Sequence, residues 1–240
     1  PPEQARAMAR LPRLIVPGQA HHVLQRSNGG QTAFVDAQDY QAMLALLAEY
    51  TQACGVAVHA YVLLPTRWQL LATPDTAEGL PAMVQAVGRR YVRQFNQRHG
   101  RRGGLWEGRF RSTVVQAGPH LLPGMVWIDT TPLREGVLQE HAEAYPWSGC
   151  ACSMGLRADR LIKPHALYWA LGNTPFAREA AYADMVHAGT SQAEALLLAD
   201  AIPKGWALGD AAFVAALQQQ TGQRAAKARP GRPRASEISP

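Results

Sequence analysis

The segment from residue 58 to residue 72 constrains the fold more than any other part of this chain. It holds two apolar runs, residues 58–64 and 68–72, which are separated by Pro65 and Thr66. Short apolar runs on either side of a proline turn are typical of buried strands, so the segment predicts two strands joined at a corner. Arg67 and Gln69 stand two positions apart on the second strand and therefore share one face. Trp68 should point to the opposite face, into the core.

Hydrophobic periodicity predicts the remaining elements. We expect strands over residues 21–26 and 110–116, and helices over residues 36–55, 79–100 and 120–130. The order strand, helix, strand, strand, helix, strand, helix favours an α+β fold, with a ferredoxin-like antiparallel sheet covered by helices on one face. An all-helical C-terminal region should follow, with helices over residues 175–187, 191–201 and 210–221.

These patterns divide the chain into four parts. They are an unstructured leader (1–8), a main domain (9–150), a helical accessory region (151–224) and a basic, disordered tail (225–240). The tail places Arg232 and Arg234 among Pro, Gly, Ala and Ser, a composition that cannot build a core. Arginines that flank such a turn are similar to a short hook that enters the minor groove of DNA.

Composition excludes several classes of protein. Hydrophobic residues make up 47% of the chain and the mean hydropathy is -0.19, as in ordinary globular proteins. No apolar run approaches the roughly 20 residues that cross a bilayer, and no signal peptide is recognisable, so we expect no membrane partner and a cytoplasmic location. The three cysteines cannot form a disulfide framework and are expected to be reduced thiols. The eight histidines are scattered, so we expect no metal site.

The charge of the chain is concentrated in one arginine-rich stretch. Lys and Arg total 24 against 18 Asp and Glu, which gives a net charge of +6. Eight arginines fall in a stretch where Glu107 is the single acid: Arg89, Arg90, Arg93, Arg98, Arg101, Arg102, Arg109 and Arg111. Tyr91, Phe95, Trp106 and Phe110 are interleaved with them. This composition is typical of a groove that follows a nucleic-acid backbone and offers aromatic platforms for bases.

Several short motifs together resemble the REP-associated tyrosine transposases, single-strand DNA transposases of the one-tyrosine HUH type. The resemblance extends over most of the chain. The motifs that carry it are residues 9–13 (ARLPR), 21–28 (HHVLQRSN), 59–65 (HAYVLLP), 88–92 (GRRYV), 105–110 (LWEGRF), 145–148 (YPWS), 205–209 (GWALG) and 231–234 (GRPR).

The resemblance implies a mechanism in which two histidines hold Mg²⁺ or Mn²⁺ on the scissile phosphate while a helix-borne tyrosine attacks it. In this chain Arg67 and Gln69 occupy the two histidine places, and Trp127 occupies the place of the tyrosine. Arginine repels a cation, glutamine is a weak neutral ligand and an indole cannot attack phosphorus. We therefore expect no intact catalytic residue, no metal and no cofactor.

The sequence thus predicts a nucleoid-associated bacterial protein that binds hairpin-forming single-stranded DNA without cleaving it. The residues expected to contact DNA are Arg26, Asn28, Arg67, Arg89, Arg90, Arg93, Arg98, Arg101, Arg102, Trp106, Arg109, Arg111, Arg232 and Arg234. The family also allows a homodimer, but nothing in the sequence sets the oligomeric state. Two alternatives stay open: a transposase that is active through a rearranged site or complemented in trans, and a catalytically dead relic that binds other proteins.

Overall fold

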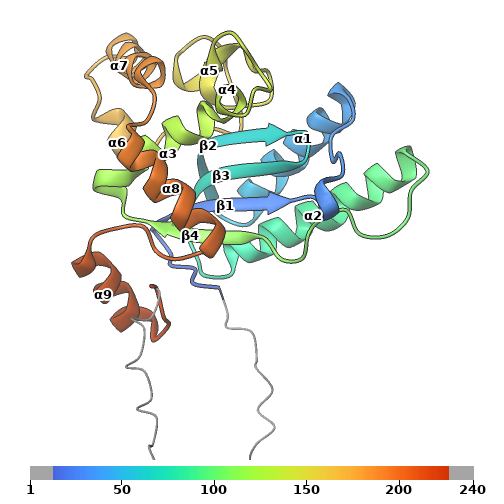
Figure 1. Ribbon diagram of the computed structural model, residues 1–240, viewed down its shortest axis with the longest axis horizontal. Helices are drawn as coiled ribbons and strands as arrows, with labels where there is room; N and C mark the ends of the chain where they lie inside the picture. Colours follow the sequence, from blue (N-terminus) through green and yellow to red (C-terminus); the bar gives the residue numbers. More distant parts are fainter. Residues whose placement is uncertain (1–12, 227–240) are drawn as a thin grey trace, which may run out of the picture.

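A four-stranded antiparallel sheet with the order β2-β3-β1-β4 forms the centre of the computed structural model, which describes residues 13–226 (Figure 1). The strands are β1 (Ala20–Arg26), β2 (Val56–Leu64), β3 (Arg67–Pro74) and β4 (Arg111–Val115). Leu64 pairs with Arg67, so Pro65 and Thr66 alone make the turn between β2 and β3. The predicted ferredoxin-like strand order and the paired strands of the opening segment are confirmed.

Helices surround this sheet. The longer ones are α1 (Ala37–Ala53), α2 (Gly79–Arg98), α3 (Ala117–Asp129), α7 (Pro175–Ala188), α8 (Gln192–Lys204) and α9 (Ala211–Thr221). The short ones are η1 (Asn28–Gly30), α4 (Thr131–Arg134), η2 (Ala142–Ala144), α5 (Cys150–Ser153) and α6 (Ala166–Trp169). All six longer helices were predicted, and α3 begins three residues earlier than expected and runs through Pro123. The short helices were missed because one turn leaves no periodicity to read.

Local sequence explains where the main helices begin. The Asp36 side chain accepts hydrogen bonds from the backbone N–H groups of Gln38 and Asp39, at 3.0 and 3.3 Å, and so caps α1. Ser191 and Glu194 form a capping box at the start of α8. These caps satisfy N–H groups that have no partner inside the helix.

Helices cover both faces of the sheet, which corrects the prediction of helices on one face. Helices α1 and α2 pack together on the first face, and α3 and α8 pack on the second. Strand β2 is buried along nearly its whole length, on both faces, and its almost continuous apolar run is the signature of such a strand. The sheet is therefore the middle layer of three.

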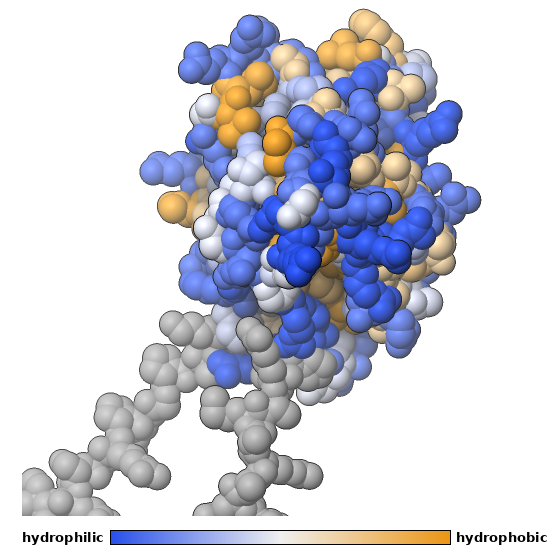
Figure 2. All heavy atoms as spheres, turned by 90° about the vertical axis from the view of Figure 1, so that its right-hand side faces the viewer, coloured by the Kyte–Doolittle hydropathy of each residue, from blue (hydrophilic) through white to orange (hydrophobic). Residues whose placement is uncertain are grey.

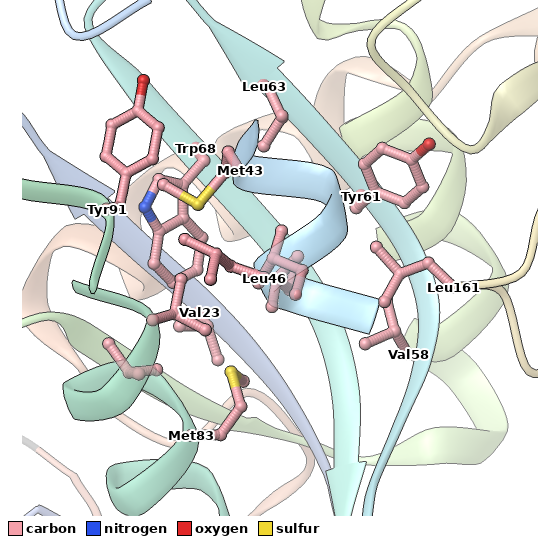
Figure 3. Close-up of a cluster of buried hydrophobic side chains, with 14 of the residues drawn as sticks. Val23, Met43, Leu46, Val58, Tyr61, Leu63, Trp68, Met83, Tyr91 and Leu161 are labelled. Carbon is pink, nitrogen blue, oxygen red and sulfur yellow. The ribbon is translucent and has the colours of Figure 1, made fainter. Parts of the chain in front are cut away.

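The first face holds the main apolar core (Figure 3). Val23 from β1 and Trp68 from β3 lie against Met43 and Leu46 of α1 and Met83 of α2. Trp68 is 1% exposed, as predicted for a side chain facing away from Arg67 and Gln69. This core fixes the sheet and leaves the polar residues of β3 on the other face.

The helical region after residue 150 shares the core of the second face. Tyr182 and Val186 of α7 and Leu198 of α8 belong to the same buried cluster as Leu24 and Val62 of the sheet. Helix α8 lies along β4, where the Thr113 hydroxyl donates a hydrogen bond to the carbonyl of Ala201 at 3.2 Å. The C-terminal end of α8 therefore lies against β4, at the side of the sheet.

The predicted leader, Arg232 and Arg234 lie outside the described residues. Ala225, with which the predicted tail begins, is buried, and its carbonyl accepts a hydrogen bond from the Ala207 N–H at 2.8 Å. The three cysteines are unpaired, as predicted. Within residues 13–226, every helix is too short or too polar to cross a membrane.

Candidate nucleic-acid interface

Three arginines gather at one end of the second sheet face. Arg26 at the end of β1 is the register partner of Arg67 at the start of β3, and Arg111 at the start of β4 is the partner of Leu24. Directly opposed like charges destabilise an antiparallel pair. The pair therefore concentrates positive charge at this end of the sheet.

A cavity of about 560 Å³, which we call the β3 cavity, opens at this end of the sheet. The residues that line it include Arg26, Arg67, Gln69, Trp127, Arg134 and Glu135. Pro203 at the end of α8 lines it as well. The structure therefore brings together the three positions, 67, 69 and 127, that the family resemblance singled out.

Trp127 presents its ring to a neighbouring guanidinium. The Arg134 guanidinium carbon lies 3.5 Å from the centre of the indole, and Arg134 Nη1 donates a hydrogen bond to the Trp127 carbonyl at 2.7 Å. The indole is half-buried against the core of the second face. Burial and the charge of Arg67 lower the pKa of Arg134 to about 10 while Glu135 raises it, so the group stays charged at neutral pH.

Arg67 and Gln69 are both held by protein partners. Arg67 forms an ion pair with Glu135, which follows α4. Gln69 Oε1 lies 2.9 Å from Nε2 of His22, a buried neighbour on β1. Burial is the main cause that lowers the pKa of His22 to about 4, although the Gln69 hydrogen bond opposes it. His22 is consequently neutral at pH 7.

The donor set of the β3 cavity does not fit a divalent cation. Three arginines, Arg26, Arg67 and Arg134, line it, and the carboxylate of Glu135 is already bound to Arg67. Across the described residues, no three His, Cys, Asp or Glu side chains converge to make a metal site. The chemistry of this cavity suits an anion instead.

A second cavity of about 850 Å³, the β4 cavity, adjoins the first, and Leu24, Arg26, Glu107 and Pro203 line both. Its basic lining residues are Arg13, Arg26, Arg109, Arg111, Lys204 and Arg224. Glu107 is the single acid in the described lining. Aromatic rings support two of the arginines: Arg13 lies 3.9 Å from the Phe110 ring centre and Arg224 lies 5.4 Å from that of Trp206.

The two cavities together form a strongly basic surface, which we call the basic groove. Figure 2 views the molecule from the side at which β1 and β2 end and shows strongly hydrophilic side chains across the middle of this face. Among residues 13–226, eight basic residues line the groove against two acids, Glu107 and Glu135. Such a balance attracts the phosphate backbone of a nucleic acid.

The predicted DNA-contacting residues do not all lie in this groove. Arg26, Arg67, Arg109 and Arg111 line it. The others in the described chain line neither cavity: Asn28, Arg89, Arg90, Arg93, Arg98, Arg101, Arg102 and Trp106. Their contact with DNA stays a prediction.

Several of the arginines outside the groove have structural partners. Arg98 pairs with Asp36 and with Asp39, which is 3% exposed and also lies 3.0 Å from His99 Nε2. Arg90 lies 3.9 Å from Glu49. Arg89 and Arg93 are exposed on α2.

Three of the four predicted aromatic platforms are wrong. Tyr91 is 1% exposed, Phe95 2% and Phe110 7%. These rings fill the core under α2 or support Arg13, so they present no face on which a base can stack. Trp106 is half-buried beside Phe34 and Tyr91, and its contact with a base stays a prediction. Aromatic residues between charges on an amphipathic helix are more often its buried face.

Sequence reasoning missed several groove residues. Arg134 and Glu135 come from the short helix α4 and its end, and Lys204, Trp206 and Arg224 come from the C-terminal region. One signal for Arg134 was available, because it lies two helical turns after Trp127. The others depend on how α8 returns to the sheet.

No family model matches this sequence, and no curated protein does either. Among solved structures, the chain is similar to a REP-associated tyrosine transposase bound to a REP hairpin. The TM-score is 0.51 and the sequence identity 15%, over 66% of this chain and 93% of the other. At this level of identity the likeness shows a shared fold and a distant structural relationship.

Proposed function

We propose that this protein binds hairpin-forming single-stranded DNA in the basic groove and does not cleave it. The observation that carries the proposal is the charge of the groove, where eight basic residues gather at one end of the sheet. Counterion release from the DNA backbone makes such a surface bind nucleic acid. The solved structure of similar fold contains a REP hairpin, which supports hairpin DNA as the ligand.

The chemistry of the groove supports binding without strand cleavage. Tyrosine, cysteine and histidine are absent from the described lining of both cavities. Ser27, Thr66 and Ser112 line the groove, but the hydroxyls of Ser27 and Ser112 are buried, and none of the three has a hydrogen bond to a histidine or carboxylate within residues 13–226. A hydroxyl without a base is a poor nucleophile. The two cationic groups Arg67 and Arg134 suit the holding of a phosphate.

Binding and cleavage can be measured with one hairpin oligonucleotide. Fluorescence anisotropy should detect binding at about 50 mM salt, and neutralisation of about four phosphates should weaken it roughly a hundredfold by about 200 mM. A linear oligonucleotide of the same composition is the control and should bind more weakly. Absence of binding at low salt would refute the proposal.

The cleavage part has its own test. The hairpin is incubated with the protein and Mg²⁺ or Mn²⁺ and then run on a denaturing gel. We expect no covalent protein–DNA band. A band would refute binding without cleavage and favour an active, rearranged site.

A second candidate function is protein binding through the C-terminal helices. Phe176 on α7 is 81% exposed, and Leu196 and Leu197 on α8 are 65% and 50% exposed. Large apolar side chains exposed in this way can mark an interaction surface. Sedimentation velocity tests self-association through these residues. A wild-type protein that sediments as a monomer, with no change in the Phe176→Ser, Leu196→Ser variant, would count against this candidate.

A further inference from the structure

The β3 cavity contains a preformed set of hydrogen-bond donors. Arg134 is fixed by three hydrogen bonds, to the Trp127 carbonyl at 2.7 Å and to the hydroxyls of Thr130 and Thr131 at 2.6 and 2.9 Å. These bonds use both N–H groups of Nη1 and one of Nη2. Of the five donors of a guanidinium, Nε–H and the second N–H of Nη2 have no partner among the described residues. Arg134 therefore holds two donors in place for a ligand.

His22 orients Gln69 as a further donor. The neutral imidazole carries one proton, and His22 Nδ1 is buried without a partner in the described chain. A proton on Nδ1 would leave a buried N–H unsatisfied, so the proton sits on Nε2 and is donated to Gln69 Oε1. The amide NH₂ of Gln69, which lines the cavity, is then left to donate to a ligand.

Glu135 supplies the anion that this set of donors lacks. Its carboxylate binds Arg67 Nη2, and its charge also acts on Arg134. Carboxylate and phosphate present similar pairs of oxygens to a guanidinium. The Glu135 side chain is 38% exposed and follows the one-turn helix α4, so it can turn away into solvent.

We propose that Arg67, Arg134 and Gln69 form a phosphate site, and that in the free protein Glu135 occupies Arg67 in place of the phosphate. Binding of a phosphate group displaces Glu135 from Arg67. This inference rests on the proposed function, because the phosphate belongs to the bound DNA. It adds that a carboxylate of the protein, Glu135, competes with the DNA phosphate for Arg67. Arg67 is therefore occupied until DNA binds.

Removal of the competing charge tests this inference. An exposed ion pair is weak, so its displacement should weaken DNA binding by a factor of about five at most. We expect Glu135→Gln to bind the hairpin about three- to fivefold more tightly than the wild type. Glu140→Gln is the matched control, because it removes the same charge from an exposed residue that lines neither cavity. Equal affinities for the two variants would overturn the inference and leave the proposed function standing.

The donor side is tested with Arg134→Lys, which keeps the charge but loses the planar donors. We expect it to bind the hairpin about tenfold more weakly and to gain less from Glu135→Gln in the double variant. An additive double variant would overturn the coupling of Arg134 to Glu135. Thermal unfolding of each variant separates these effects from loss of the fold.

Inorganic phosphate provides a readout that does not depend on DNA. Titration of phosphate, followed by the fluorescence of the tryptophans, should show tighter binding for Glu135→Gln than for the wild type and none for Arg134→Gln. Identical titrations would overturn the site even if DNA binds elsewhere. Hairpins with a 5′-phosphate and with a 5′-hydroxyl distinguish the source: equal affinity assigns a backbone phosphodiester, and tighter binding of the former assigns a terminal phosphate.

Discussion

The two faces of the sheet are built from the same strands but have opposite characters. The face under α1 and α2 is filled by Val23, Trp68 and Leu70, and its arginines lie on the outside of α2. The face under α3 and α8 carries Arg26, Arg67 and Gln69 at one end, beside the basic groove. The comparison shows that the arginine-rich stretch of the sequence and the basic cavities of the fold are largely different surfaces: the first lies mainly on the outside of α2, and the second lies at the end of the half-polar sheet face.

The largest expected effect is on the free energy of unfolding, and it comes from a buried carboxyl on the second face of the sheet. Asp129 at the end of α3 is fully buried and accepts a hydrogen bond from the Tyr182 hydroxyl at 2.7 Å. Burial raises the pKa of Asp129 from 3.8 to about 7, although the hydrogen bond opposes the shift. The folded state therefore favours the neutral carboxyl. Its contribution to the free energy of unfolding is intact below about pH 4 and is lost as the pH rises through 7.

The total loss between about pH 4 and pH 8 should reach about 4 kcal/mol, and Asp129→Asn should remove it. Urea unfolding at pH 6 and pH 9 measures the last part of this loss, about 1 kcal/mol. The buried histidines act oppositely: burial lowers the pKa of His21, His22 and His59 from 6.5 to about 4, so their contribution is present above 6.5 and lost as the pH falls to 4. The same alkaline loss in Asp129→Asn would show that Asp129 is not its source.

A charge reversal on each side of the sheet compares the faces directly. We expect Arg26→Glu with Arg109→Glu, both in the groove, to weaken hairpin binding roughly a hundredfold and to flatten the salt dependence. The matched control is Arg89→Glu with Arg93→Glu on α2, which makes the same change in net charge on exposed residues. It should weaken binding less than about threefold. Equal losses would mean that α2 contacts DNA as well, as the sequence predicted.

The smallest expected effect is on hairpin affinity. It tests whether the cluster of Asp39, Arg98 and His99 is structural or contacts DNA. Asp39→Asn leaves Arg98 and His99 without their buried partner and should lower the free energy of unfolding by about 2 kcal/mol. Hairpin affinity should stay within about twofold. A weakened hairpin interaction with unchanged urea stability would place this cluster in the interface instead.

Much of the fold was predictable because it depends on local patterns. The helical periodicity of α1 and α2 and the apolar runs of β2 and β3 gave the order of the elements, which was sufficient to predict a ferredoxin-like antiparallel sheet with helices packed on it. The predicted covering of one face failed because periodicity does not tell which layer a later helix joins. The apolar residues on both faces of β2 held that information.

The candidate site was predictable in part. Arg67, Gln69 and Trp127 were chosen from the sequence, and they line one cavity. Arg134 and Glu135 were not chosen, because they belong to a one-turn helix and act only through partners brought close by the fold. Tyr91 and Phe95 were predicted both to point inward from α2 and to serve as platforms for bases. Their burial in the core excludes the second role.

The sequence by itself determined the strands, the main helices and the basic character of the chain, because these follow from side-chain periodicity and charge. Only the tertiary structure decided where basic residues distant in the sequence gather. Strand register sets Arg26 opposite Arg67, and the return of α8 along β4 brings Pro203 and Lys204 to the same end of the sheet. Contacts between residues so far apart in the chain depend on packing, which no local pattern records.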